Sequence, residues 1–262
     1  MNDRFRIGTL NIRNVTDRWD ERRPLLLTEF AALRPDLWGL QEVVYPVFEQ
    51  DRIIAAAGTT PYEVRRGPAG RAEYGNAILV REPLAATLVP DGQADHLDLG
   101  LERSAMSVQA SLPSGVSIRF VATHLHHVVA ALAERDEQVR RILDWLDDRP
   151  PTDATVVVGD FNAAPTEPAC ARMWAAGFRS AMVEANGTEP EVTWPTGIIA
   201  PTMDTDGGPR CLDYVWLRGA IAARAARLCF DVAPVDDPTI FPSDHRGIVV
   251  EAEIGPGLGS RT

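Results

Sequence analysis

Hydrogen-bonding and ionisable side chains stand at the points where apolar, strand-like segments of this sequence meet loops. These residues are Asn11, Glu42, His124, Asp160, Asn162, Asp213, Asp244 and His245. A strand end is a good position for a catalytic group, because the sheet holds the backbone rigid while the loop leaves the side chain accessible. The pattern therefore indicates one catalytic centre assembled from distant parts of the chain.

The residue types in this set fit the hydrolysis of a phosphate ester. That reaction requires a hard cation held by oxygen ligands, a group that orients or deprotonates water, and donors for the charge that develops on the phosphate. Glu42, Asp244 and Asn11 could supply oxygens to Mg²⁺ or Mn²⁺. Asp160 could orient and deprotonate the water, with Asn162 beside it as an amide donor.

The two histidines, His124 and His245, could stabilise the phosphate oxygens or protonate the leaving group. This chemistry requires no zinc site. Cys170, Cys211 and Cys229 show no C-x-x-C spacing, and we expect them to be buried apolar residues in a reducing compartment.

The run from His124 to His127 invites comparison with a dinuclear zinc motif of the form H-x-H-x-D-H. Residues 128 and 129 are both valine, so the aspartate and the last histidine of that motif are absent and a zinc hydrolase is disfavoured. If strand alternation continues past His124, His126 lies on the same side and could line the pocket. His127 is then expected to be solvated.

Apolar segments with strand character recur along the chain. They are Phe5–Leu10, Asp36–Gln41, Asn76–Val80, Ala105–Leu112, Val116–Thr123, Thr155–Gly159, Leu212–Leu217, Arg227–Val232 and Gly247–Ile254. Two of them flank Pro113-Ser114-Gly115, a sequence typical of a hairpin turn.

Apolar residues at helical spacing lie between these strand-like segments. One stripe falls within 26–33 and another within 132–146, and a third helix is expected from about Val47 to a cap at Gly58. Many strands, few helices and a hairpin indicate a mixed α/β (α+β) protein. We expect one domain over residues 1–262, with a loose tail at 255–262.

The composition is acidic, with 37 acidic residues against 26 basic residues, all of them arginine, and a net charge of -11. This balance disfavours broad non-specific binding to nucleic acid, which requires a basic face. No apolar run approaches the ~20 residues that a membrane span requires. Met1–Arg6 is not followed by the apolar core of a secretory signal, so we expect a cytoplasmic location.

Short motifs around the candidate residues occur in one order along the chain. They are Thr9-Leu-Asn11, Leu40-Gln-Glu42, Tyr74-Gly-Asn-Ala-Ile-Leu79, Thr123-His124, Gly159-Asp160-Phe-Asn162, Leu212-Asp213-Tyr and Ser243-Asp244-His245. Each motif is weak alone, whereas the ordered set is specific. It resembles the endonuclease/exonuclease/phosphatase superfamily, also called DNase I-like, from residue 9 to residue 247.

The resemblance implies a four-layer α/β/β/α sandwich of two mixed sheets, with a divalent-metal phosphoesterase site at one sheet edge. It also implies that Asp213 orients His245. Glu73, just before Tyr74, would orient His124 in the same way.

The substrate is left open, because such a superfamily includes nucleases, sphingomyelinase-like lipases and inositol-phosphate phosphatases. The acidic balance favours a small phosphorylated metabolite or a short nucleic-acid end, and an endo- or exonuclease acting on DNA or RNA is the alternative. A non-catalytic binding module with the same fold is disfavoured, since Glu42, Asp160 and His245 are all present.

For three arginines and one tryptophan, the sequence leaves two interpretations open. Arg65, Arg66 and Arg71 are either solvated or face an anionic substrate near Glu73. Trp194 either packs in the core or stacks against the substrate.

Overall fold

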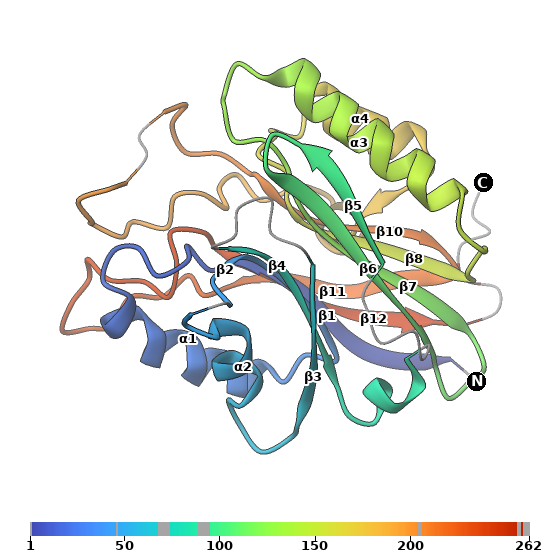
Figure 1. Ribbon diagram of the computed structural model, residues 1–262, viewed down its shortest axis with the longest axis horizontal. Coiled ribbons are helices and arrows are strands. Elements are labelled where there is room, and N and C mark those ends of the chain that lie inside the picture. Colours follow the sequence, from blue (N-terminus) through green and yellow to red (C-terminus); the bar gives the residue numbers. More distant parts are fainter. Residues whose placement is uncertain are drawn as a thin grey trace.

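Two six-stranded β-sheets pack face to face and carry helices on their outer surfaces (Figure 1). The structure, a computed structural model, describes residues 2–45, 47–67, 74–88, 95–203, 206–255 and 258. Within these ranges, no helix has the length and apolar character needed to cross a membrane. The tail expected at 255–262 lies outside the described residues, apart from Gly255 and Leu258.

The first sheet combines the N-terminal strands with the last two strands of the chain. Its order is β11 (Ile221–Cys229), β12 (Gly247–Ile254), β1 (Asp3–Asn11), β2 (Leu37–Val43), β4 (Gly75–Arg81) and β3 (Tyr62–Arg66). β1 and β2 are parallel, with Asn11 opposite Gln41. Asn11 and Glu42 therefore leave the sheet at the same edge.

The second sheet is formed by the middle of the chain. Its order is β5 (Asp95–Gly100), β6 (Arg103–Ser111), β7 (Ser117–His124), β8 (Ala154–Asp160), β10 (Asp213–Gly219) and β9 (Arg179–Ser180). The parallel pair β7–β8 ends with His124 opposite Asp160. The antiparallel β10 starts with Asp213 opposite Asp160, so three candidate residues share one edge of this sheet.

Alternate residues along the central strands face either the gap between the sheets or an outer helix. In β8, Val156 and Val158 lie in the core between the sheets, whereas Val157 packs in the cluster formed with α3 (Leu132–Asp147) and α4 (Pro168–Ala175). α1 (Trp19–Leu33) and α2 (Gln50–Ala55) cover the outer face of the first sheet (Figure 1). The four-layer α/β/β/α sandwich expected from the sequence is confirmed.

Two elements lie at positions other than those predicted. The strand expected at Arg227–Val232 is instead β11, which starts at Ile221 and ends before Phe230, where the backbone becomes left-handed (φ 58°). The helix expected from Val47 to Gly58 is confined to α2, which ends at Ala55 with Ala56 as its C-cap.

Three edge strands and two short helices were not predicted from the sequence. β3, β5 and β9 lie next to only one neighbouring strand each, and every residue of β3 is only half-buried, so no apolar alternation marks it. β5 carries His96, whose side chain is exposed. α4 and α5 (Ala181–Asn186) are short enough to depend on packing more than on their own helical pattern.

Candidate active site

Asn11 connects the two sheets at their shared edge. Its Nδ2 atom donates to Glu42 Oε1 at 3.3 Å and to Asp160 Oδ2 at 3.1 Å. Glu42 comes from β2 of the first sheet and Asp160 from the end of β8 in the second. One amide therefore brings together two carboxylates whose positions in the sequence are far apart.

Glu42 is held at an irregular point of its strand. Its backbone is left-handed (φ 57°), where the pairing between β2 and β4 shifts register. Its carboxylate accepts side-chain amide hydrogens from Asn11 and from Asn14, the latter at 2.9 Å. Among the residues that the structure describes, no arginine comes within ion-pair distance of this carboxylate.

Asp160 is almost completely buried, at 1% exposure. Its Oδ1 atom accepts the backbone N–H of Asn162 at 2.9 Å, and Asn162 takes a left-handed conformation (φ 49°) that closes this turn. Asn162 Nδ2 donates to the carbonyl of Leu125 at 3.1 Å. The turn after β8 thus aims both side chains at the sheet edge.

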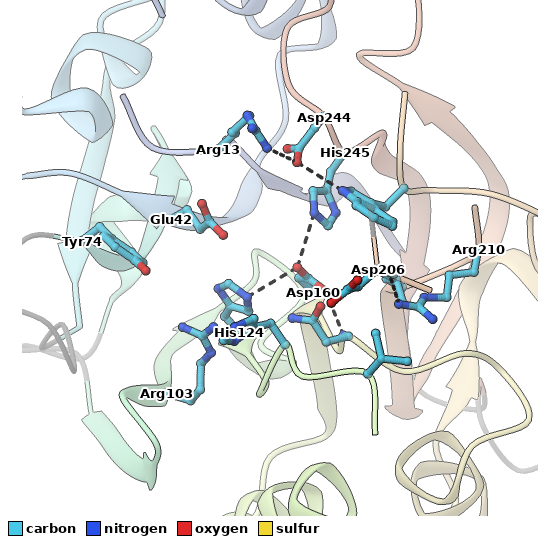
Figure 2. A pocket seen from close by; sticks show the side chains of 15 residues that line it. Arg13, Glu42, Tyr74, Arg103, His124, Asp160, Asp206, Arg210, Asp244 and His245 are labelled. Carbon is cyan, nitrogen blue, oxygen red and sulfur yellow. Dashed lines mark hydrogen bonds and ion pairs between the residues drawn. The ribbon is translucent and has the colours of Figure 1, made fainter. Parts of the chain in front are cut away.

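Two histidines approach the same oxygen of Asp160. His124 Nε2 lies 3.5 Å and His245 Nε2 lies 3.6 Å from Asp160 Oδ2. Figure 2 shows the two imidazole rings on different sides of this carboxylate, with the Glu42 carboxylate directed toward the space between them. The side chains of His124 and His245 are 7% exposed, so each keeps only a small opening toward solvent.

A third carboxylate orients one of these rings. His245 Nδ1 lies 2.9 Å from Asp213 Oδ2. Asp213 is held in turn by Thr193, whose hydroxyl oxygen accepts the backbone N–H groups of Leu212 at 2.8 Å and Asp213 at 3.1 Å. The loop before Trp194 therefore stabilises the start of β10.

The two histidines have opposite electrostatic surroundings. Burial and the nearby guanidinium of Arg103 lower the pKa of His124 well below its ordinary value. Burial also lowers the pKa of His245, but the carboxylates of Asp213, Asp160 and Asp244 outweigh it and raise that pKa well above the ordinary value. At neutral pH, His124 is therefore neutral and His245 carries a positive charge.

Burial and neighbouring charges shift the pKa of the Asp160 carboxyl group in both directions. Burial raises its pKa, the positive charge of His245 opposes this effect, and the negative charge of Asp213 adds to it. The net effect is a raised pKa, as is typical of a carboxylate that exchanges protons near neutral pH.

Asp244 lies in the same cleft but is heavily hydrogen-bonded. Its Oδ2 atom is 2.5 Å from Arg13 NH1 and accepts the indole N–H of Trp194 at 3.2 Å. Its Oδ1 atom lies 3.3 Å from the Ser243 hydroxyl, which donates its hydrogen to the Asn11 carbonyl at 2.6 Å. Trp194, with 7% exposure, is thus both packed and hydrogen-bonded, with its ring centroid 6.5 Å from that of His245.

The oxygen-rich end of the cleft fits a hard divalent cation. Glu42 offers a carboxylate without a cationic partner among the described residues, and Asn11 Oδ1 accepts only the Arg13 N–H, at 3.0 Å, which leaves it a second lone pair. Asp160, Asp213 and His245 also present ligand atoms within 4.8 Å of one another. There, however, the positive charge of His245 opposes a cation, so Glu42 is the more suitable carboxylate.

The cleft has a volume of about 220 Å³. Residues that the sequence motifs single out line much of it, namely Glu42, His124, Asp160, Asn162, Trp194, Asp244 and His245. Asn11 and Asp213 stand behind these and hold them by hydrogen bonds.

Further residues line the cleft that were not predicted as site residues. They are Arg13, Tyr74, Arg103, His127, Val129, Asp206, Arg210 and Leu212. Tyr74 and Leu212 stand inside the ordered motifs and His127 in the histidine run, and Arg13 follows Asn11 by two residues at a strand end. The other four carry no signal in the sequence.

The positions of His126 and His127, after β7, are the reverse of those expected. His127 lines the cleft, where Arg103 NH2 lies 3.0 Å from its Nδ1 atom, whereas His126 is absent from the lining. The expectation assumed that the strand continues, but β7 ends at His124 and the alternation ends with it.

Two of the three arginines that could face an anionic substrate have protein partners. Arg65 forms an ion pair with Glu63, and Arg66 Nε lies 2.5 Å from Asp51 Oδ2. Neither lines the cleft. Arg71 and Glu73 lie outside the described residues.

Comparisons with known proteins agree with this architecture. The sequence model of the endonuclease/exonuclease/phosphatase family matches residues 8–245. No curated protein is similar enough in sequence to count as a match.

Solved structures share the fold at low sequence identity. An endonuclease/exonuclease/phosphatase family protein from Bacteroides thetaiotaomicron superposes with a TM-score of 0.77 at 14% identity, covering 100% of this chain and 99% of that one. TDP2 of D. rerio, complexed with single-strand DNA product, gives 0.74 at 19% identity, covering 95% and 99%. The catalytic domain of human Nocturnin with bound sulfate gives 0.73 at 20% identity, covering 97% and 98%.

Proposed function

Because this chain belongs to the endonuclease/exonuclease/phosphatase family, we propose that it hydrolyses phosphate esters with the help of a bound Mg²⁺ or Mn²⁺ ion. The observation that carries the proposal is the position of Asp160 between His124 and His245, at 3.5 and 3.6 Å. A raised carboxyl pKa beside one neutral and one charged imidazole supports proton transfer and charge stabilisation in one cleft.

Glu42 and Asn11 are the residues that would hold the cation, through a carboxylate and an amide oxygen. When bound, such an ion polarises a phosphoryl oxygen and offsets negative charge. The hydrogen bonds from Asn11 and Asn14 keep the Glu42 carboxylate in place before any ligand arrives.

Asp160 accepts the proton of the attacking water. Its Oδ1 atom is fixed by the Asn162 backbone, while Oδ2 faces the two histidines and Asn11. One N–H of the Asn162 side chain donates to Leu125, and the other hydrogen of this amide remains for a substrate oxygen.

His245 stabilises the charge that builds on the phosphate, because Asp213 keeps its imidazole protonated and oriented. His124, held neutral by burial and by Arg103, adds a polar contact without a second positive charge. The two histidines therefore have different roles, although each lies against the same carboxylate oxygen.

The substrate class that we favour is a small phosphorylated metabolite or a short nucleic-acid end. A net charge of -11 supports a compact substrate over a long duplex, because binding a long duplex requires a broad basic face. The D. rerio TDP2 structure contains a single-strand DNA product, which makes a nucleic-acid end a relevant probe. The three buried free cysteines support a reducing, cytoplasmic location.

A substrate panel tests the proposal. The purified protein would be assayed on phosphodiesters, phosphomonoesters and short DNA and RNA ends, each with Mg²⁺, Mn²⁺ or EDTA. We expect metal-dependent hydrolysis of at least one compact ester and little cleavage of long duplex DNA. Hydrolysis that is equally fast in EDTA, or no hydrolysis of any ester, contradicts the proposal.

A further inference from the structure

Arg13 is the centre of a buried ion-pair cluster beside the candidate cation site. Its NH1 atom lies 2.5 Å from Asp244 Oδ2, and its NH2 atom lies 2.5 Å from Asp17 Oδ2. The three side chains are 9%, 8% and 6% exposed, in the order Arg13, Asp244 and Asp17. At this burial, solvent and salt screen the pairs only weakly.

A neutral donor joins each of the two oxygens that Arg13 binds. Asp244 Oδ2 also accepts the indole N–H of Trp194, and Asp17 Oδ2 accepts the hydroxyl hydrogen of Thr202. The Ser243 hydroxyl lies 3.3 Å from Asp244 Oδ1 but donates its hydrogen to the Asn11 carbonyl at 2.6 Å. A carboxylate oxygen that is already paired with a guanidinium and with a second donor has little left to offer to a metal ion.

Arg22 supplies a second positive charge behind the cluster. It is completely buried, and its guanidinium donates to backbone carbonyls, including those of Ile12 at 3.1 Å, Thr16 at 2.7 Å and Pro242 at 2.9 Å. Arg22 forms no ion pair within the described residues, but its charge interacts with Asp244 and Asp17 through space. The two guanidinium charges thus formally balance those of the two carboxylates without a metal ion.

The same contacts fix the loop between β1 and α1. Arg13, Asn14 and Asp17 have left-handed backbones, with φ of 55°, 37° and 43°. This strained path requires support, and the carbonyls that it turns inward are those that Arg22 binds. The loop consequently directs Arg13 to Asp244 and Asn14 to Glu42.

We propose that Arg13 is a built-in counter-ion that prevents Asp244 from acting as a metal ligand, so that the site binds a single divalent cation, at Glu42. This inference rests on the proposed function and assigns Asp244 to positioning rather than to ligation. A second divalent ion next to Asp244 would stand beside the Arg13 guanidinium and be repelled by it.

Removal of the guanidinium should reverse this arrangement. In Arg13→Gln, the two Oδ2 atoms that flank Arg13, together with the Thr202 hydroxyl, form an oxygen-rich site without its cation. Hard divalent cations bind such sites. Arg13→Lys is the matched control, because it retains a positive charge at this position.

Mn²⁺ binding to the full chain, measured by electron paramagnetic resonance and isothermal titration, tests the proposal without reference to turnover. We expect about one Mn²⁺ per chain for wild type and Arg13→Lys, and about two for Arg13→Gln. The double variant Arg13→Gln/Asp244→Asn should return to about one. Glu42→Gln should bind the wild-type ion at least about tenfold more weakly.

Other stoichiometries overturn the inference. It is wrong if wild type binds about two ions, if it binds none, or if folded Arg13→Gln binds no more than wild type. Should Arg13→Gln fail to fold by circular dichroism, Asp244→Asn decides, since it retains the wild-type ion under this proposal and loses it if Asp244 is a ligand. One Mn²⁺ per chain without hydrolysis of any ester removes only the proposed function.

Discussion

His245 Nδ1 lies 2.9 Å from Asp213 Oδ2, and both side chains are buried. Asp213 starts β10, whereas His245 stands just before β12 in the other sheet. The hydrogen bond therefore joins the two sheets and leaves His245 Nε2 facing Asp160. It makes the charge of His245 depend on a residue that is remote in sequence.

Asp213→Asn should impair turnover more at high pH than at low pH. Asp213 raises the pKa of His245, so wild type keeps the imidazolium above the ordinary histidine pKa of about 6.5. The amide removes this support, and the variant loses the charged ring at a lower pH. Turnover of both proteins from about pH 6 to 9 measures the ratio across this range.

Asp153→Asn is the control for that experiment, because Asp153 is an exposed carboxylate that bonds Ser117. A ratio that does not change with pH would make Asp213 purely structural. A ratio that improves with rising pH would make His245 a neutral general base.

Asp160→Asn should reduce turnover by roughly 10²–10⁴-fold, the range for a positioned acid or base. The amide cannot accept the proton of water, although it can still receive the hydrogen bond from Asn162. Single-turnover rates at saturating substrate, compared with the exposed control Asp148→Asn, give the effect. A loss of less than about tenfold would exclude Asp160 as the base.

Removal of the metal should abolish hydrolysis, and Mg²⁺ or Mn²⁺ should restore it after EDTA treatment. Glu42→Gln should require at least about tenfold more metal for half-maximal activity, because the carboxylate charge is lost and the single amide oxygen can keep only one of the two contacts with Asn11 and Asn14. Glu137→Gln on the surface of α3 is the matched control. Equal metal requirements for both variants would disprove a ligand role for Glu42.

Gly159→Ala should destabilise the fold by about 3 kcal/mol, because it overpacks a closed position. Gly159 has φ 146°, and a Cβ atom there would lie 1.9 Å from the carbonyl oxygen of Thr123. Gly115→Ala also has a positive φ, of 83°, but meets no atom within 4 Å, so it should cost only about 1 kcal/mol. Urea unfolding of both variants measures the difference, and equal losses would contradict the steric explanation.

The central strands and the order of the polar motifs can be derived from the sequence alone. β12 has the bounds Gly247–Ile254 that its apolar run predicts, and β8 extends the prediction by one residue at each end. These strands are covered on both faces, so their composition depends on burial rather than on one particular neighbour. β3 lacks such a signature and the run at Arg227–Val232 marks only the end of β11, because edge strands are defined by the strand beside them.

The environment of each candidate residue was decided only by the tertiary structure. In the sequence, Asp244 does not differ from other carboxylates near strand ends. Only the fold brings Arg13, from the other end of the chain, into an ion pair with it. His124 and His245 are the same residue type at similar strand ends, yet one lies near Arg103 and the other against Asp213. Their opposite charge states follow from these neighbours, because a buried imidazole takes its pKa from the charges that the fold places around it.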